Sequence, residues 1–242
     1  MATYFLQIKN FPKLFVWMLP LFLIACISSQ PYPRGVVEAQ PQPTPVVRPP
    51  RVGQEWVYQV RNVFNQEVVD VITEKVVSVG DQIRISRSGV KVGQLPDEIQ
   101  SPWGYVIQDP HWSPPQIFTP AVPLWPTQLN PQPNVFYQSR YQALGYPDAS
   151  YYWGLGINAS QWEHLSVAAG QFLTLKYRNE IPYFQSQDVF RVSNNRQEDI
   201  WFSPEIGRWV IRRSFGRYLL GGMRWNSALW EDYLEWELIS WR

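Results

Sequence analysis

The chain has 242 residues, enough for one large folded domain or two small ones. Its formal net charge is +1, so the balance of charges gives no reason to expect a nucleic-acid partner. Aromatic residues make up 16% of the sequence, which predicts either a core packed with large rings or a surface on which ligands stack.

The first 25 residues are typical of an export signal. Lys9 and Lys13 precede residues 14–25, an uncharged apolar run with the sequence LFVWMLPLFLIA. A membrane-spanning helix needs roughly 20 such residues, and Pro20 would disturb it further. We therefore expect residues 1–25 to be a signal peptide that is removed.

Cys26 is the only cysteine of the chain, so it cannot form an internal disulfide. The stretch Leu23-Ile24-Ala25-Cys26 resembles the lipobox of bacterial lipoproteins. This resemblance implies cleavage before Cys26 and acylation of that residue, and several acyl chains exceed the two signals that stable anchoring requires. It also implies the outer membrane, because Ile27 rather than Asp follows the cysteine. The alternatives are a chance cysteine in an ordinary signal peptide and an uncleaved anchor.

Residues 26–51 are rich in Pro, Gln, Val and Ser, which predicts a flexible or polyproline-like tether behind the lipid. From residue 52 to residue 242 the pattern is that of short strands. EWVYQVRN and EVVDVITEKVVSV (residues 67–79) read as strands, and the second run places Val69, Val71, Thr73, Val77 and Val79 on one apolar face. Turns are expected at Gly80-Asp81, Gly170, residues 193–195 and residues 203–207, and YLEWELISW reads as a closing strand.

No long window has a helical period, so the sequence predicts a mainly β fold. We expect one antiparallel β domain of about eight to ten strands, either a sandwich or a strongly curved, half-barrel sheet. Residues 95–150 interrupt the pattern with eleven prolines, a density that argues against central strands. They also contain Trp103, Trp112, Phe118 and Trp125, so we expect an extended insertion that packs its rings on the sheet, with one strand near residues 135–141.

A second resemblance covers most of the β domain. SVAAGQF and IWFSPEIGRWVIR are similar to motifs of uncharacterised β-rich envelope lipoproteins. Both motifs are mainly turn chemistry, in which Pro204 presets φ and Gly207 permits the return. The resemblance implies a β-sheet fold and no particular activity.

The sequence contains no catalytic or metal-binding motif. The chain has two histidines, His111 and His164, and neither lies in a cluster with metal-ligand spacing. Asp109 and His111 are two residues apart, which alone is weak evidence for a metal site or a catalytic triad. Glu235 and Glu237 are expected on a solvated strand face. We therefore predict no catalytic residue, no metal and no cofactor.

The remaining candidates are aromatic side chains beside small or polar residues, which stack sugars or grip peptides when they are exposed. They are Tyr151, Tyr152, Trp153, Trp162, Trp225 and Trp230. The competing interpretation, rings that fill the core, is favoured by the usual burial of Trp and Tyr. Only an exposed patch would favour a binding site.

The sequence thus predicts a lipid-anchored envelope protein that acts as a non-enzymatic binding or scaffold module, with the membrane as one partner through Cys26. An envelope protein, a glycan or a hydrophobic molecule is the candidate second partner. One alternative is a carrier of lipid or another hydrophobic ligand in a curved sheet, with a cavity lined by Leu173, Leu175 and Trp201. The other is an envelope glycan hydrolase, which needs two carboxylates within about 10 Å across a groove.

Overall fold

The computed structural model describes residues 35–186, 188–221, 228–231 and 233–242, and these residues contain strands but no helix. The strands in chain order are β1 (Val36–Glu38), β2 (Glu55–Asn62), β3 (Val68–Val79), β4 (Ile83–Gly89), β5 (Gly93–Gln100), β6 (Tyr105–Asp109), β7 (Gln116–Pro123), β8 (Gln132–Ala143), β9 (Tyr146–Val167), β10 (Gly170–Phe184), β11 (Arg191–Ser203), β12 (Arg208–Leu220), β13 (Ala228–Trp230) and β14 (Leu234–Trp241). A mainly antiparallel β fold was expected, and it is confirmed. No helix in this described part is long and apolar enough to cross a bilayer.

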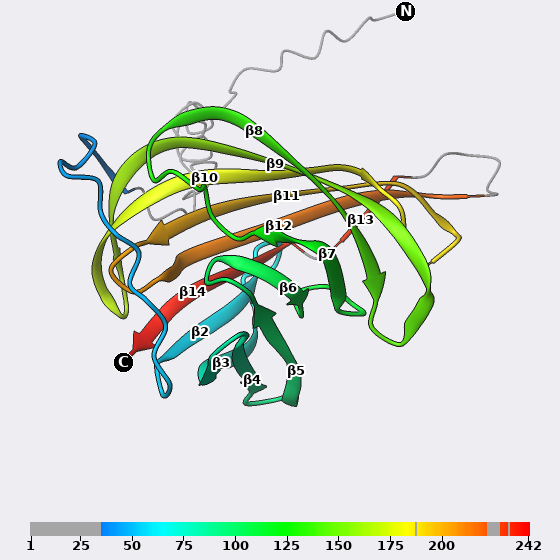
Figure 1. Ribbon diagram of the computed structural model, residues 1–242, viewed down its shortest axis with the longest axis horizontal. Coiled ribbons are helices and arrows are strands. Elements are labelled where there is room, and N and C mark those ends of the chain that lie inside the picture. The colour runs from blue at the N-terminus through cyan, green and yellow to red at the C-terminus, as the bar shows by residue number, and fades with distance from the viewer. Residues whose placement is uncertain (1–34, 187, 222–227, 232) are drawn as a thin grey trace, which may run out of the picture. The chain divides into compact units, whose positions relative to one another are not determined.

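The sheet closes on itself into a barrel. Its order is β9-β10-β11-β12-β14-β2-β3-β4-β5-β6-β7-β8, and β8 pairs again with β9, so that 12 strands form a ring. Strand β1 adds to β9 outside the ring, and β13 pairs with β12. Figure 1 shows the long strands β8 to β12 arching over the shorter strands β2 to β6.

Closure corrects the predicted sandwich or half-barrel, and the fourteen strands exceed the predicted eight to ten. The ring depends on pairings between distant segments, above all β14 with β2, which joins residues 234–241 to residues 56–62. It also depends on the length of β9, whose 22 residues pair with β8 on one side and β10 on the other. A closed sheet leaves few unpaired edges, which protects the backbone against pairing with other chains.

Most of the predicted turns are present. Residues 80–82 connect β3 to β4, and Gly170 has a φ of 132° at the start of β10. Gly207 has a φ of 64° in the β11–β12 turn, where the carbonyl oxygen of Arg48 would lie only 2.8 Å from an added Cβ. The turn expected at residues 193–195 is wrong: β11 continues through it, with Ser193 at a register shift.

The proline-rich section forms strands, so the expectation that it lacks central strands is wrong. Pro96, Pro120, Pro133 and Pro147 lie inside β5, β7, β8 and β9, and each falls at a shift of register against a neighbouring strand. A residue at such a bulge is left out of the ladder, so the missing N–H of proline breaks no ladder hydrogen bond. The strand near residues 135–141 is confirmed as part of β8, and Trp112, Phe118 and Trp125 are buried.

Part of the segment predicted as tether lies on the barrel. Val36–Glu38 form β1, which pairs with Trp162–His164 of β9. Arg48 donates from its backbone nitrogen to the Pro204 carbonyl oxygen at 2.8 Å and accepts from the Trp103 indole at 3.1 Å. At these residues the segment expected to be a free tether therefore contacts the barrel, while residues 26–34 and the predicted signal peptide lie outside the described residues.

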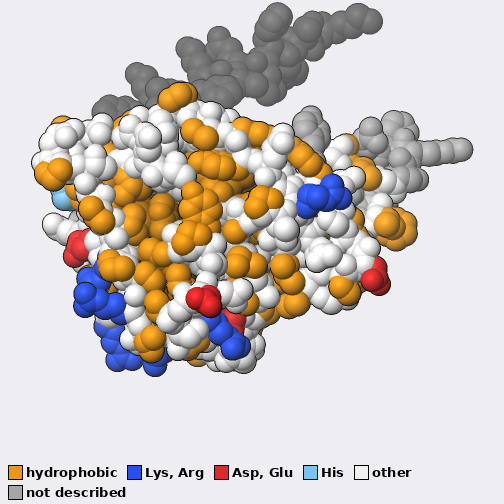
Figure 2. Space-filling model, viewed as in Figure 1, with side chains coloured by type: hydrophobic (Ala, Val, Ile, Leu, Met, Phe, Trp, Pro, Cys, Tyr) orange, Lys and Arg blue, Asp and Glu red, His pale blue; other side chains and the backbone are white. Residues whose placement is uncertain are grey.

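The buried face of β3 is opposite to the apolar face identified in the sequence. Val69, Val77 and Val79 are exposed, whereas Asp70, Ile72, Glu74 and Val76 are buried. Glu74 is on the inner face because buried arginines bind it there, as described below. On the surface, hydrophobic side chains gather across the middle of the face in Figure 2, with charged side chains mainly toward its edges.

Candidate functional site

Charged side chains fill the middle of the barrel. The side chains of Arg208, Glu74 and Glu98 have no exposed surface. The guanidinium of Arg208 donates to Glu74 Oε2 at 2.7 and 3.1 Å, and to both carboxylate oxygens of Glu98 at 2.7 Å. Strands β12, β3 and β5 supply the three residues, so the contact ties three parts of the ring together. Because all three groups are paired, the cost of removing them from water is largely offset.

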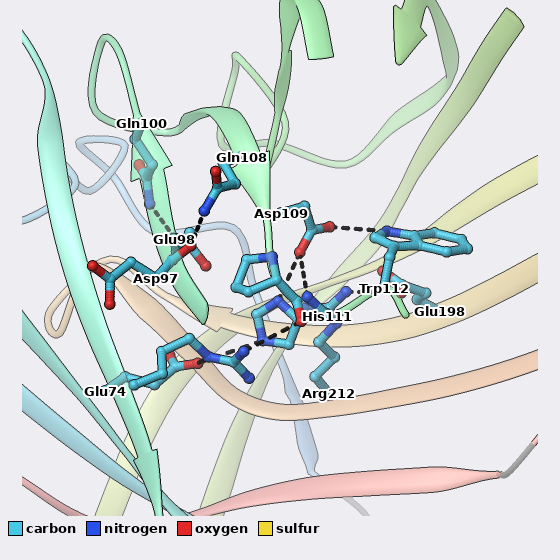
Figure 3. Close-up of polar contacts among 12 residues, drawn as sticks. Glu74, Asp97, Glu98, Gln100, Gln108, Asp109, His111, Trp112, Glu198 and Arg212 are labelled. Carbon is cyan, nitrogen blue, oxygen red and sulfur yellow. Dashed lines mark hydrogen bonds and ion pairs between the residues drawn. The ribbon is translucent and has the colours of Figure 1, made fainter. Parts of the chain in front are cut away.

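The cluster continues through Arg87 and His111. Arg87 Nε donates to Glu74 Oε1 at 3.0 Å. The ring of His111 lies between two acids, with Nδ1 2.8 Å from Asp109 Oδ1 and Nε2 3.4 Å from Glu74 Oε1 (Figure 3). It is also packed edge-on between the rings of Trp209 and Trp236. The weak Asp109–His111 signal in the sequence therefore marks a packed structural pair.

Arg212 and Glu198 complete what we call the central ion network: Glu74, Arg87, Glu98, Asp109, His111, Glu198, Arg208 and Arg212. Arg212 Nη2 donates to Glu198 Oε1 at 2.8 Å. Within the described part of the chain, no group of His, Cys, Asp and Glu side chains is arranged to hold a metal ion. The acids of the network contact arginine or histidine instead.

The pairing determines the ionisation of the network. Burial raises the pKa of Glu74, but the charges of Arg208, Arg87 and His111, with a hydrogen bond from His111, together outweigh burial and hold that pKa well below its usual value. Burial likewise raises the pKa of Asp109, and the hydrogen bond from His111 with the charges of His111 and Arg212 brings it far below the usual range. For Glu198, burial is outweighed by the charges of Arg212 and Arg196, which lower the pKa. These carboxylates are therefore ionised at neutral pH.

A cavity of about 500 Å³ opens beside this network. We call it the end pocket, because its residues come from one end of the barrel: the start of β7, the β10–β11 turn, the first part of β11, the later part of β12, and β13. Arg196 joins the two regions, since it lines the pocket and its Nε lies 3.1 Å from Glu198 Oε1 of the network. The volume lies within the range of small-molecule sites.

The charges of the end pocket are matched in sign. Arg191 lies 3.5 Å from Asp188 and 3.5 Å from Glu231. Arg196 contacts Glu198 and, at 3.9 Å, Glu231. The pocket therefore has no excess charge of either sign among its described residues.

Two polar atoms of the pocket lack hydrogen bonds within the described structure. The side chain of Gln116 is buried, yet its Oε1 has no donor. Arg196 Nε approaches Glu198 Oε1 without the alignment of a hydrogen bond, so it also has no acceptor. Most buried polar atoms in proteins are paired, and an unpaired one costs roughly 1–3 kcal/mol. Both atoms have almost no exposed surface, so they belong to the wall of the cavity and not to its open space.

Aromatic rings form much of the remaining wall. Trp112, Phe184, Tyr218 and Trp230 line the cavity. The guanidinium of Arg196 lies over the Trp112 ring at 4.3 Å, and that of Arg191 over the Tyr218 ring at 4.2 Å. Trp230 differs from the other three because its side chain is 54% exposed. Its ring stacks on Phe215, with the centroids 4.8 Å apart.

The structure separates the aromatic residues that the sequence singled out. Trp153 and Trp162 are buried in the core, and Tyr151 packs against Tyr141. Tyr152 is exposed but does not line the end pocket. Trp230 does line it, while Trp225 and Cys26 lie outside the described residues. For Trp153 and Trp162 the competing interpretation, rings that fill the core, is the correct one.

Two further sequence expectations change. Glu235 is buried and paired with Arg213, so the predicted solvated face of β14 is wrong for this residue. The polar residues of the end pocket were missed, as were the acids and arginines of the network. Glu74 carried a signal, because it alternates with Ile72 and Val76, and a lone charge on an apolar strand face indicates a buried partner. Gln116 and Arg196 carry no comparable signal.

The fold and the pocket together define a closed antiparallel β domain with a polar cavity at one end. A search of protein-family models and a search of curated proteins each found no match. Among solved structures, the chain is similar to a predicted lipoprotein of Parabacteroides distasonis, with 11% identity and a TM-score of 0.51 over 83% of this chain and 100% of that one. It is also similar to a predicted exported protein of Bacteroides fragilis with a YmcC-like fold, with 9% identity and a TM-score of 0.51 over 82% and 99%. At these identities the likeness shows the fold alone.

Proposed function

We propose that this chain is an exported lipoprotein, anchored by lipid on Cys26, that binds a ligand in the end pocket without transforming it. The observation that carries the binding role is the pocket itself, an open cavity of about 500 Å³ lined by charged and polar side chains and by the exposed Trp230. The lipobox-like sequence at Leu23–Cys26 supports the anchor, and Ile27 after the cysteine supports the outer membrane. The similar solved structures are themselves described as a lipoprotein and an exported protein, which supports export.

The position of the pocket fits an anchored protein. The described chain begins beside β9, at residues 162–164, which pair with residues 173–175 of β10. Phe184, at the pocket, lies eleven residues beyond Leu173, a path of roughly 36 Å along an extended strand. In Figure 1 the first described residues, drawn in blue, lie at the end of the barrel opposite to β13. The pocket therefore lies at the other end of the barrel from residues 36–38.

The carrier alternative finds little support. Leu175 and Trp201, which would line its cavity, are buried in a continuous core, and Leu173 packs against that core. The middle of the barrel contains the central ion network, a poor environment for an apolar ligand.

The hydrolase alternative has a carboxylate pair to consider. Asp188 and Glu231 both contact Arg191, which places them within about 10 Å of each other, as a glycan hydrolase needs. One acid of such an enzyme must be protonated, whereas both of these share one cation. We therefore propose binding without hydrolysis.

Growth of the host in radioactive palmitate tests the anchor. The wild-type chain should be labelled and Cys26→Ser should not. Equal labelling of the two, or no labelling of the wild type, contradicts lipidation.

Thermal unfolding of the full-length protein in detergent tests the pocket. Fractions of a bacterial envelope extract should raise the Tm of the wild type and of Phe136→Ala, which alters an exposed ring that does not line the pocket. They should not raise the Tm of Trp230→Ala. A ligand at 100 times its Kd adds about 2.7 kcal/mol, a Tm increase of about 5–10 °C for a chain of this size. Equal responses of both variants contradict the pocket, and conversion of the recovered ligand contradicts the absence of catalysis.

A further inference from the structure

We propose that the barrel end nearest the anchor binds anionic phospholipid headgroups of the membrane through a cluster of arginines. The cluster, which we call the arginine end, consists of Arg48, Arg51 and Arg242 around the ring of Trp241. This inference rests on the proposed lipid anchor and gives the anchored domain a second contact with the bilayer. Three observations support it: the excess of positive charge, the cavity between the arginines and the short distance to Cys26.

The arginine end has more cations than acids. Arg242 lies 3.1 Å from Glu55, and its side chain is still 74% exposed. Among the described residues, no acid lines the cavity of the arginine end, so Arg48 and Arg51 supply the excess positive charge. Figure 2 shows Lys and Arg side chains gathered at this corner of the molecule, where Figure 1 has the C-terminus. The end pocket, by contrast, is lined by acids as well as arginines.

The sequence places Arg48 and Arg51 on one side of the chain. Residues 48–51 read RPPR, and each proline holds φ near −65°. An extended proline segment has three residues per turn, so residues three apart point the same way. The guanidinium of Arg48 lies 5.3 Å from the centre of the Trp241 ring, and the Arg51 backbone nitrogen donates to Gln54 Oε1 at 3.2 Å. Both arginines therefore line the same cavity.

The cavity between these side chains has a volume of about 170 Å³. One water occupies roughly 30 Å³ in the liquid, so the cavity has room for a phosphate group. A guanidinium presents a planar fork of N–H donors that matches the oxygens of a phosphate. Tryptophan is enriched where bilayers meet water, because its ring is apolar and its N–H is polar. The combination fits the headgroup region of a membrane.

The arginine end lies close to the start of the described chain. The rings of Trp241 and Phe172 have centroids 6.4 Å apart, and Phe172 pairs with Leu165 of β9. A Cβ added to Gly35 would lie 3.0 Å from the side chain of Leu165. Gly35 follows Cys26 by nine residues. Since each residue spans at most about 3.6 Å, a lipid on Cys26 keeps Gly35 within about 32 Å of the bilayer. The tether therefore brings the arginine end, rather than the end pocket, to the membrane.

Vesicle flotation tests the proposal on residues 26–242 with Cys26→Ser. This chain lacks the lipid and the predicted signal peptide, and it retains the closed ring of strands. The vesicles are phosphatidylcholine alone, or phosphatidylcholine with roughly a third of phosphatidylglycerol. The chain should bind the anionic vesicles and not the neutral ones. Each arginine near an anionic surface contributes about fivefold, so Arg48→Gln with Arg51→Gln should weaken binding about 25-fold.

Arg140→Gln with Arg217→Gln is the matched control, because it removes the same charge from two exposed arginines that do not line the cavity. It should bind as the parent chain does, and Arg48→Lys with Arg51→Lys should retain most of the binding. Equal Tm values of the variants show that a loss of binding is not a loss of folding.

Equal binding of the two glutamine double variants, or binding of neutral vesicles as strong as that of anionic ones, would overturn the proposal. Release from the vesicles by inorganic phosphate at constant ionic strength would assign the cavity to a free anion instead. Binding of an anionic polysaccharide in place of the vesicles would assign it to a glycan. Either result contradicts a membrane contact.

The chain in this experiment has no lipid, so the result is independent of the anchor. If flotation fails while palmitate labels the wild type and not Cys26→Ser, the anchor stands and only the second contact is wrong. Flotation without palmitate labelling would support the arginine end as a membrane contact and contradict the anchor.

Discussion

The central ion network and the end pocket contain the same residue types in different states of pairing. In the network, the guanidinium of Arg208 is shared between Glu74 and Glu98, and no side-chain surface of these three residues is exposed. In the pocket, Arg191 is 38% exposed and makes ion pairs no shorter than 3.5 Å, while Gln116 Oε1 has no partner. The comparison teaches that burial and the closeness of ion pairing, rather than residue type, separate a structural charge cluster from a site open to a ligand.

Removing one arginine from each region should give the largest difference in stability between the central ion network and the end pocket. Arg208→Met leaves Glu74 and Glu98 buried beside fewer positive charges, so we expect a loss of about 3–5 kcal/mol in the free energy of unfolding. Arg191→Met removes a half-exposed partner, and a loss of about 0–1 kcal/mol is expected. Denaturant unfolding of both variants measures the difference. Equal losses would show that the network is no more structural than the pocket rim.

The second largest expected effect is a loss of stability in acid, which acts on the carboxylates of the central ion network. The folded-state pKa values of Glu74, Asp109 and Glu198 lie below their unfolded values, so their contribution to stability is complete above the unfolded values near pH 4. It is lost as the pH falls toward the folded values, because the unfolded chain then binds more protons. Each such proton contributes a slope of about 1.4 kcal/mol per pH unit.

Unfolding experiments between pH 7 and pH 2 measure that slope. The free energy of unfolding should be nearly constant from pH 7 to about pH 5 and fall below that. Glu74→Gln removes one of the three carboxylates, so its acid slope should be shallower than that of the wild type. An identical slope would mean that the acid sensitivity arises outside the network.

Several strands outside the proline-rich section were predictable from the sequence because hairpins depend on local signals. The strand EWVYQVRN is observed as β2 with the same bounds, and Gly170 and Gly207 adopt the positive φ that their turns require. The closed ring was not predictable, since it depends on pairings such as β14 with β2 between the two ends of the domain. The prolines misled for a related reason: bulges that accommodate Pro96 and Pro120 depend on the neighbouring strand.

The site was predictable only in part. The sequence singled out Trp230 as an aromatic residue beside polar ones, yet Trp153 and Trp162 have the same local sequence character and are core residues. Glu74 selects the inner face of β3 through Arg208, which is 134 residues away in the sequence. Gln116 and Arg196 meet in one cavity only because β7 and β11 reach the same end of the barrel. None of these contacts can be predicted from the residues that neighbour each one in the sequence.

The smallest expected effect on stability compares two buried glutamines. Gln100 contacts Glu98 of the central ion network, and Gln116 lines the end pocket. Gln100 donates to Glu98 Oε1 at 2.5 Å and accepts from the Gly104 backbone nitrogen at 2.8 Å, so Gln100→Leu should cost about 1–3 kcal/mol by leaving these partners unpaired. Gln116→Leu instead removes an acceptor that already lacks a donor. Its free energy of unfolding should change by less than about 1 kcal/mol in either direction. Denaturant unfolding without ligand measures both variants. A cost for Gln116→Leu as large as that for Gln100→Leu would show that the Gln116 side chain makes a stabilising hydrogen bond in the folded protein.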